Sequence, residues 1–349
     1  VLTAIRSLNS TSLDDERASP PDDLPLVSIV IPARNEERNI ARCLLSALTS
    51  DYSRLEVIVV NDHSEDATAG IAREIAKSDP RVAVIDNPAL PPDWFGKQWA
   101  CHNGAAASTV EIILFSDADT IHSSDLVTRS INAMERRNAE LFSVMGRQEL
   151  GSFWERLIQP QIFGVMCVRY GGTDSITNSR DVSSKIANGQ CLFVRRPTYE
   201  ALGGHSMVKN HVADDLMLAQ RFFANGKRVV LEEGLKQQST RMYTSLSELI
   251  HGWGKNVFAG GREAAMFGAL GRVLFPALLL SAPLFGLVPA LVLLYAAIFG
   301  VGDGLLAWAV IACAATLVWW VFFYLRMEVS PLYALIYPVG SALILYIFL

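Results

Sequence analysis

The sequence predicts an α/β fold: a mostly parallel sheet with helices on both faces, followed by an amphipathic helix and about three transmembrane helices. Apolar, β-branched runs alternate with amphipathic stretches over residues 26–244, as in strand–helix–strand units. Residues 245–268 contain a tryptophan-bearing amphipathic stretch, and residues 269–349 are overwhelmingly apolar. Residues 1–25 are polar and contain several prolines, so we expect a linker or the remnant of an upstream segment. The chain starts at Val1, and a signal or membrane anchor could precede it.

The first half of the α/β domain is expected to contain four strands, each followed by a helix. The strands are residues 26–31, 55–60, 82–85 and the apolar run that begins at Val110 and stops at Asp117. The helices are expected at residues 40–48, 71–75, 97–107 and 126–136. In the first two helices apolar residues recur at three- or four-residue spacing, so each has an apolar face for the sheet.

The second half of the domain contains shorter expected elements. They are strands at residues 141–145 and 228–231, a strand within 186–196, a turn at 203–205 and a helix at 211–223. A helix is also expected at 152–170, where the sequence is amphipathic, aromatic and unusually apolar for a surface helix. A helix at a membrane surface and a helix in a protein core would both show this pattern, so both interpretations stay open.

Hydropathy predicts three membrane spans, each close to the length that crosses a bilayer. They lie at residues 273–299, 305–325 and 330–349. The first is long enough to be tilted, or broken at Pro283 or Pro289. The amphipathic helix at 245–259 comes directly before the spans and carries Trp253, so we expect it to lie in the plane of the membrane interface.

Arginines flank the predicted spans unevenly. Arg262 and Arg272 precede the first span and Arg326 lies between the second and third, whereas the link at 300–304 has no basic residue. Positively charged residues favour the cytoplasmic side of a membrane. We therefore expect an integral protein of a bacterial-type cytoplasmic membrane, with the globular domain in the cytoplasm.

The composition argues against several classes of function. The net charge is -5 over 349 residues and no basic stripe appears, which disfavours a nucleic-acid partner. No Gly-x-Gly-x-x-Gly follows the first strand and no Gly-Lys-Ser/Thr occurs, which disfavours a dinucleotide dehydrogenase and a P-loop NTPase. The five cysteines are scattered without metal-ligand spacing, so we expect free thiols in a reducing compartment.

The apolar run at residues 110–120 ends abruptly at Asp117 and Asp119. Ligands bind beyond the carboxyl ends of strands in open α/β sheets, and residues two apart on an extended segment face the same side. Both carboxylates could therefore hold one hard cation, Mg²⁺ or Mn²⁺, that also binds diphosphate oxygens. The alternative is an ordinary acidic turn after a strand.

Further polar residues are expected at the same edge of the sheet. Glu36 and Asp62 could bind the ribose or base of a nucleotide, and Lys97 also falls at this edge. Each carboxylate also has a simpler explanation, because Glu36 could favour the dipole of the following helix and Asp62 could cap one. A second acidic pair, Asp214 and Asp215, opens a helix. It could be a helix cap or could supply a general base that deprotonates an acceptor hydroxyl.

Six short motifs follow one another along the domain. They are Pro-Ala-Arg-Asn-Glu-Glu at 32–37, Val-Val-Asn-Asp-His-Ser-Glu-Asp-Ala-Thr at 59–68, Gly-Lys-Gln-Trp-Ala at 96–100, Asp-Ala-Asp at 117–119, Asn-Gly-Gln at 188–190 and Asp-Asp-Leu at 214–216. In this order the chain resembles, over residues 26–260, family 2 glycosyltransferases of the GT-A fold, in particular the membrane-bound lipid glycosyltransferases of carotenoid, hopanoid or ceramide glycosylation. The resemblance implies a nucleotide-sugar donor, inversion at the anomeric carbon, and a metal held mainly by the Asp-x-Asp.

The resemblance also implies roles for individual residues. The donor-binding set is Pro32, Arg34, Glu36, Asp62, Lys97 and Asp117, to which we add Arg241 and Lys255 as cations for the leaving diphosphate. Asp117 and Asp119 would hold the divalent metal, and Asp215, beside Asp214, would be the catalytic base. Gly189 and Gln190 are expected at the acceptor side. Trp253 could stack on the acceptor or anchor its helix at the membrane interface.

Two departures from the family pattern narrow the expected function. Asn61 stands where many relatives have the first acid of Asp-Asp-Gly-Ser, so Asp62 alone is retained. The Gln-x-x-Arg-Trp of processive synthases is absent, with Gly-Trp-Gly-Lys-Asn at 252–256 instead. We therefore expect transfer of a single sugar from a UDP-sugar to a membrane lipid hydroxyl. The alternatives are a polyprenyl-phosphate acceptor, a non-catalytic nucleotide-binding membrane scaffold and a GT-A-like nucleotidyltransferase.

Overall fold

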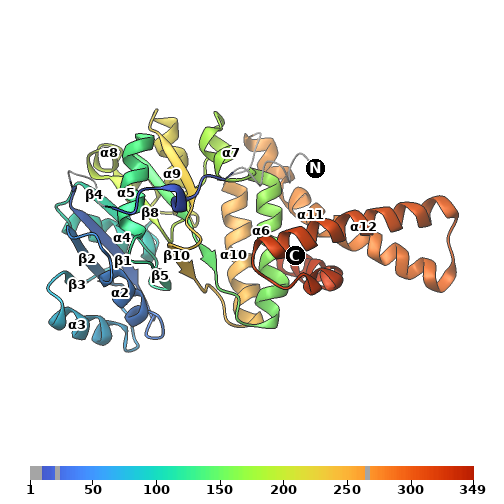
Figure 1. Ribbon diagram of the computed structural model, residues 1–349, viewed down its shortest axis with the longest axis horizontal. Coiled ribbons are helices and arrows are strands. Elements are labelled where there is room, and N and C mark those ends of the chain that lie inside the picture. Colours follow the sequence, from blue (N-terminus) through green and yellow to red (C-terminus); the bar gives the residue numbers. More distant parts are fainter. Residues whose placement is uncertain (1–9, 20–23, 264–267) are drawn as a thin grey trace. The chain divides into compact units, whose positions relative to one another are not determined.

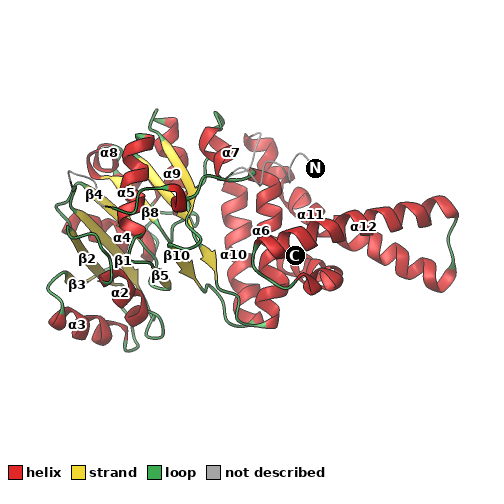
Figure 2. Cartoon of the chain, in the orientation of Figure 1, coloured by secondary structure: helices red, strands yellow, loops and turns green. Residues whose placement is uncertain are grey.

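The structure is a computed structural model that describes residues 10–19, 24–263 and 268–349. The described residues form two compact units. The first comprises described residues of Val1–Glu149 and Gly171–Met242, and the second those of Leu150–Tyr170 and Tyr243–Leu349. The strands all belong to the first unit, and the second unit is helical (Figure 2). The helix expected at 152–170 therefore belongs to the second unit, although the sequence placed it within the domain at 26–244.

A seven-stranded sheet forms the centre of the first unit (Figure 1). Its order is β3 (Val82–Asp86), β2 (Leu55–Asn61), β1 (Val27–Ala33), β4 (Ile112–Phe115), β8 (Leu192–Arg195), β6 (Leu141–Met145) and β9 (Val229–Glu233). Among the described strands of this sheet, β8 alone runs antiparallel to its neighbours. The prediction of a mostly parallel sheet is confirmed. Because β1 to β4 run in one direction, their carboxyl ends meet at one edge.

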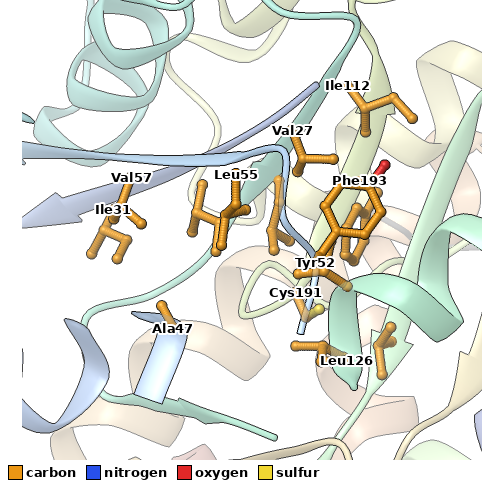
Figure 3. Packing of buried hydrophobic residues seen from close by; sticks show 14 of the residues in the cluster. Val27, Ile31, Ala47, Tyr52, Leu55, Val57, Ile112, Leu126, Cys191 and Phe193 are labelled. Atoms are coloured by element: carbon orange, nitrogen blue, oxygen red, sulfur yellow. The ribbon is translucent and has the colours of Figure 1, made fainter. Parts of the chain in front are cut away.

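Apolar clusters cover both faces of this sheet. Side chains alternate along β1, so that Ile29 and Ile31 join one cluster and Val30 joins the other. The first cluster, part of which is drawn in Figure 3, is completed by α2 (Ile40–Leu48), α3 (Thr68–Ser78) and α5 (Leu126–Arg137). The second is completed by α4 (Gly96–Ala107), α8 (Arg196–Ala201) and α9 (Asp214–Ala224). Burial of both faces explains why the central strands are apolar along nearly their whole length.

A small three-stranded sheet in the first unit was not predicted from the sequence. It consists of β5 (Thr120–His122), β10 (Gln238–Thr240) and β7 (Arg147–Gln148). Strands this short carry no periodic pattern, so the sequence offers no signal for them. Because β5 starts directly after Asp119 and pairs with β10, residues 238–240 lie beside the Asp117–Asp119 turn.

The N-terminal residues 10–19, expected to be part of a linker, lie against the first unit. Leu13 is fully buried in the first apolar cluster. The Arg129 guanidinium on α5 donates hydrogen bonds to the backbone oxygens of Leu13, Asp14 and Glu16 at 3.1, 3.1 and 2.7 Å. One leucine in a polar stretch has no periodic partner, which is why the sequence pattern did not predict this contact.

The second unit contains the helices of membrane-spanning length. It consists of α6 (Phe153–Tyr170), α10 (Leu246–Glu263), α11 (Gly268–Phe299), α12 (Asp303–Arg326), the 3-10 helix η4 (Pro331–Ile336) and α13 (Tyr337–Phe348). Three segments are long and apolar enough to cross a membrane, namely Val273–Phe299, Asp303–Arg326 and Pro331–Phe348. The first span is not broken, because α11 continues through Pro276, Pro283 and Pro289. The third consists of η4 followed by α13.

Helix α6 packs inside the second unit. Leu157, Ile158 and Ile162 are buried. The amide of Gln161 donates hydrogen bonds to the Tyr324 hydroxyl and the Tyr337 carbonyl at 3.3 and 3.2 Å. Two interpretations of this stretch were open, a helix at a membrane surface and a helix in a protein core. The buried face of α6 fits the second.

Candidate functional site

A cleft of about 420 Å³ opens at the carboxyl edge of the parallel strands in the first unit. It is formed by the end of β1, the segments that follow β1, β2 and β4, and the first turns of α4. The residues that line it are Pro32, Ala33, Arg34, Glu36, Asp62, Gly96, Lys97, Ala100, Asp117, Ala118 and Asp119. The fold thus brings together every predicted donor- or metal-binding residue except Arg241 and Lys255.

Asp62, directly after β2, lies in this cleft and is only 5% exposed. Its Oδ1 accepts a hydrogen bond from the Asn87 amide at 2.7 Å, and its Oδ2 lies 3.9 Å from the Arg34 guanidinium. A Cβ added at Gly96 would lie 2.6 Å from Oδ2 of Asp62. The start of α4 can therefore approach this carboxylate only because residue 96 is glycine.

Glu36 lies in the turn that leads into α2. Its Oε2 accepts a hydrogen bond from the Asn39 amide at 2.9 Å. Burial raises the pKa of Glu36, and the negative charges of Asp117 and Asp66 raise it further. The hydrogen bond from Asn39 lowers this pKa, but its effect is smaller than that of burial. Asp66, and not Asp62, binds the first turn of α3, where its Oδ1 accepts the backbone N–H of Thr68 at 2.9 Å. The simpler helix-capping explanation for Asp62 therefore does not hold.

Lys97 forms an ion pair with the first acidic pair of the site. Its Nζ lies 2.6 Å from Oδ1 of Asp117. Burial would lower the pKa of Lys97, but the negative charges of Asp117 and Asp214 outweigh burial and hold that pKa well above its usual value. The ammonium group stays charged, and its field acts on both pairs.

The carboxylates of Asp117 and Asp119 fit a divalent cation. Oδ1 of Asp119 is buried and has no hydrogen-bond partner among the described residues. Burial, together with the charges of Asp117 and Glu36, raises the pKa of Asp119 to about 7. Within the described ranges no group of three or more His, Cys, Asp or Glu side chains could hold a metal ion. A cation bound here would therefore need further oxygens, such as those of a diphosphate.

Asp214 begins α9 and is nearly buried, with 7% of its surface exposed. Its Oδ2 lies 3.7 Å from Nε2 of His205. Burial would raise the pKa of Asp214, but the charge of Lys97 and the contact with His205 outweigh it and lower that pKa. Asp214 is therefore held as a carboxylate.

Asp215 has different surroundings. Its Oδ2 accepts the backbone N–H of Gly189 and its Oδ1 that of Leu216, both at 2.7 Å. Burial and the charge of Asp214 raise the pKa of Asp215 to about 6. A Cβ added at Gly189 would lie 3.0 Å from Oδ2, so glycine permits the close approach of this backbone. The buried Gln190 follows Gly189 in the same turn.

The remaining predicted residues lie outside this cluster. Arg241 directly follows β10, whose Thr240 hydroxyl donates a hydrogen bond to the backbone oxygen of Asp119 at 3.5 Å. Lys255 and Trp253 are on α10 in the second unit, where Lys255 is exposed.

The indole of Trp253 is 6% exposed and packs edge-on against Phe163 and Tyr243, with ring centroids 5.6 and 5.9 Å apart. This ring belongs to the core of the second unit rather than serving as an exposed anchor or stacking platform.

Three residues of the site were not singled out from the sequence. Asn87, which binds Asp62, follows β3 at the same sheet edge, so the rule that ligands bind beyond strand ends could have indicated it. His205 lies 3.7 Å from Asp214 and contacts Tyr199, and these two residues come from two short helices without a periodic pattern. Only the fold brings these two residues to the site.

Comparison with known proteins identifies the family. The family model for glycosyl transferase family 2 matches residues 28–203, half of the chain. The 4,4'-diaponeurosporenoate glycosyltransferases of Staphylococcus haemolyticus (strain JCSC1435) and Staphylococcus aureus (strain MRSA252) are each 30% identical to the chain, over 240 and 254 residues. These alignments cover 67% and 71% of this chain. The chain spans 61% and 66% of the length of these relatives.

A solved structure shows the same fold. The mannosyltransferase PcManGT from Pyrobaculum calidifontis, solved in complex with GDP-Man and Mn²⁺, has a TM-score of 0.57 to this chain at 19% identity, over 98% of this chain and 93% of that one. This likeness confirms the predicted fold class, a GT-A-type α/β domain with C-terminal helices of membrane-spanning length. With half of its length matched by the family model, the chain belongs to glycosyl transferase family 2.

Proposed function

We propose that this chain is a metal-dependent glycosyltransferase that moves one sugar from a UDP-sugar to the hydroxyl of a membrane lipid. The observation that carries the proposal is the cleft at the carboxyl edge of the sheet, which brings Asp62, Lys97 and the Asp117–Asp119 pair together. The Lys97 ammonium contacts Asp117 at 2.6 Å, and its charge acts on Asp214, the neighbour of Asp215. We propose that this cleft binds the diphosphate of the donor and that Asp215 supplies the base, as sugar transfer requires.

The cleft has the groups that a nucleotide-sugar needs. Asp62 and Glu36 would accept hydrogen bonds from the ribose or base, and Lys97 would bind the diphosphate. Asp117 and Asp119 would hold a divalent cation, which when bound neutralises charge on the leaving diphosphate. The mannosyltransferase of similar fold binds GDP-Man and Mn²⁺, which supports a nucleotide-sugar donor and a divalent cation here.

The proposed reaction is a single displacement. The carboxylate of Asp215 accepts the proton of the acceptor hydroxyl, whose oxygen attacks the anomeric carbon. The bond from that carbon to the diphosphate oxygen breaks, the nucleotide diphosphate leaves, and the anomeric configuration is inverted. Lys97 remains protonated and stabilises the negative charge of the leaving group. General-base assistance of this kind contributes roughly 10²- to 10⁴-fold to the rate.

The acceptor is proposed to come from the bilayer. Three segments of the second unit are long and apolar enough to cross a membrane, so the chain is associated with one. The staphylococcal relatives are named for a carotenoid acceptor, which supports an apolar acceptor here. The uneven distribution of arginines around the spans supports a cytoplasmic position for the catalytic domain.

Incubation of the purified full-length protein with radiolabelled UDP-sugars, Mn²⁺ or Mg²⁺ and extracted membrane lipids tests this proposal. Label should enter the lipid fraction, and Asp215→Asn should reduce the rate by about 100-fold or more. Asp93→Asn, at an exposed position outside the cleft, serves as the control and should leave the rate unchanged. Absence of labelled lipid with every UDP-sugar would refute the proposal.

A second candidate is transfer to an acceptor that is already ionised. The relatives are named for diaponeurosporenoate, a carboxylate, and a polyprenyl phosphate would be equivalent in this respect. Such an acceptor has no proton to lose and needs no base. Full turnover by Asp215→Asn would favour this candidate over a lipid hydroxyl.

A further inference from the structure

Two asparagines next to Asp62 form a short series of hydrogen bonds that the proposed reaction does not use. Asn87, directly after β3, is 3% exposed and lies outside the set of described residues that line the cleft. Its Nδ2 donates a hydrogen bond to Oδ1 of Asp62 at 2.7 Å. Its Oδ1 accepts a hydrogen bond from Nδ2 of Asn103 on α4 at 2.8 Å. Burial of an amide costs free energy unless its hydrogen bonds are made, and both ends of the Asn87 amide have a partner.

The acceptors at the two ends of this series fix the direction of both amides. Nδ2 of Asn103 also donates a hydrogen bond to the backbone oxygen of Trp99 at 2.9 Å. A backbone carbonyl and a carboxylate can only accept hydrogen bonds, so neither asparagine can exchange its nitrogen and oxygen without losing its partners. The backbone of residue 87 is held as well, because the N–H of Asn87 donates to the carbonyl of Asn61 at 2.9 Å.

This series determines which oxygen of Asp62 is left for a ligand. Oδ1 is occupied by the Asn87 amide. Oδ2 lies 2.6 Å from the position of a Cβ added at Gly96 and 3.9 Å from the Arg34 guanidinium. Gly96 and Arg34 both line the cleft. Oδ2 is therefore the oxygen on the cleft side, where it can accept a hydrogen bond from a bound nucleoside.

We infer that Asn87, oriented by Asn103, is a positioning residue that occupies Oδ1 of Asp62 and so presents Oδ2 to the nucleoside of the donor. The inference rests on the proposed function, in which Asp62 accepts hydrogen bonds from the ribose or base. Because Asn87 acts through Asp62, its effect on binding depends on the side chain at residue 62. The effect is also confined to the nucleoside, because the diphosphate is proposed to bind Lys97 and the cation at the Asp117–Asp119 pair.

Exchange of the two side chains tests the inference, with the affinities for UDP and for inorganic pyrophosphate, both in the presence of Mg²⁺ at pH 8, as separate readouts. Asn87→Asp keeps the shape of the side chain but sets a carboxylate against Oδ1 of Asp62, and should weaken UDP binding about tenfold or more. Asp62→Asn should also weaken it about tenfold, because the Asn87 amide binds the new amide oxygen and leaves the new NH₂ group facing the nucleoside.

The exchanged double variant, Asp62→Asn with Asn87→Asp, should recover UDP affinity. The new amide at residue 62 can donate its hydrogen bond to the new carboxylate at residue 87, which turns the amide oxygen back toward the cleft. This variant should therefore bind UDP at least about threefold more tightly than either single variant. Asn103→Ala, a milder change, should weaken UDP binding about threefold. Pyrophosphate affinity should stay within about twofold of the wild type in all four variants.

Asn132→Ala on α5 is the matched control. Its Nδ2 also donates two hydrogen bonds, to the backbone oxygens of Arg17 and Ser19 at 2.8 and 3.0 Å, and it lies outside the residues that line the cleft, so neither affinity should change. Thermal unfolding of each variant shows that it is folded. Losses that multiply in the exchanged variant, or an equal loss of pyrophosphate affinity, would overturn the positioning role. A wild-type protein that binds UDP but glycosylates no lipid would refute the proposed function instead, and the exchange would still decide the role of Asn87.

Discussion

Asp214 and Asp215 are adjacent in the sequence, yet their surroundings separate their chemistry. The charge of Lys97 and the contact with His205 lower the pKa of Asp214 and keep it ionised. Asp215 accepts backbone N–H groups and lies next to the negative charge of Asp214, so its pKa is raised to about 6. Active sites often place two neighbouring acids in different environments, so that their pKa values differ. One acid then stays charged, as Asp214 does, and the other can accept a proton, as is proposed for Asp215.

This difference predicts how turnover depends on pH. A base must be deprotonated to act, so kcat/KM should be constant above about pH 7 and fall about tenfold per pH unit well below 6, the pKa of Asp215. The measurement is a pH profile of kcat/KM at saturating metal. In Asp215→Asn this acid limb should disappear from the residual activity. An identical limb in that variant would assign the titration to another group.

A methyl group at residue 96 should disturb the nucleotide site without unfolding the protein. In Gly96→Ala the new Cβ would lie 2.6 Å from Oδ2 of Asp62, so this carboxylate must move. We expect the affinity for UDP, measured by titration calorimetry, to fall about tenfold, the cost of roughly one misplaced hydrogen bond. Gly70→Ala on α3, where a Cβ meets nothing within 4 Å, is the matched control and should bind UDP as the wild type does.

Removal of the divalent cation should weaken nucleotide binding through Asp119. The buried Oδ1 of this residue has no partner among the described residues, and a diphosphate without a cation would add repulsion from Asp117. Addition of EDTA should therefore lower UDP affinity about tenfold or more in the wild type. Asp119→Asn should bind UDP weakly and respond little to EDTA. A full EDTA response in this variant would place the cation elsewhere.

The sequence predicted the strands whose carboxyl ends form the cleft. It did not predict several shorter elements that lie beside the cleft. β1, β2 and β4 are buried on both faces, and their long apolar runs indicated both the strands and the edge where Asp62 and Asp117 lie. Residues 120–122 and 238–240 are too short to show a period, and His205 reaches Asp214 only through the packing of η3 (Gly204–Val208) against α9. The sequence also placed α6 in the α/β domain, because amphipathicity does not reveal the surface against which a helix packs.

The N-terminal segment should contribute measurably to stability. Leu13 is fully buried in the first apolar cluster, so Leu13→Ala should lower the free energy of unfolding by about 2–5 kcal/mol, the usual cost of a leucine-sized cavity. Leu45→Ala on α2, where 56% of the side chain is exposed, should change it by about 0.5 kcal/mol or less. Denaturant unfolding of the full chain measures both. Equal, small effects would show that residues 10–19 do not pack on the unit in solution.

For the whole molecule, the proposed function requires the donor cleft and the membrane-spanning segments to serve one reaction. A nucleotide-sugar is charged and soluble, whereas the proposed acceptor lies in the bilayer. A chain that holds an α/β unit and three segments of membrane-spanning length can bring the two substrates together without releasing either. The proposed reaction requires the α/β unit to face the compartment that supplies the donor. The side of the membrane on which the α/β unit lies can be tested.

The arginine distribution predicts that side. The link at 300–304 has no basic residue and should face outward, and the α/β unit should face the cytoplasm. Gly302→Cys and Gly70→Cys form a matched pair, since both glycines are exposed and a Cβ at either meets nothing within 4 Å. In intact cells a membrane-impermeant maleimide should label Gly302→Cys above the wild-type background, and it should label Gly70→Cys only after permeabilisation. The reverse pattern would place the α/β unit outside and remove the cytoplasmic donor pool from the proposed reaction.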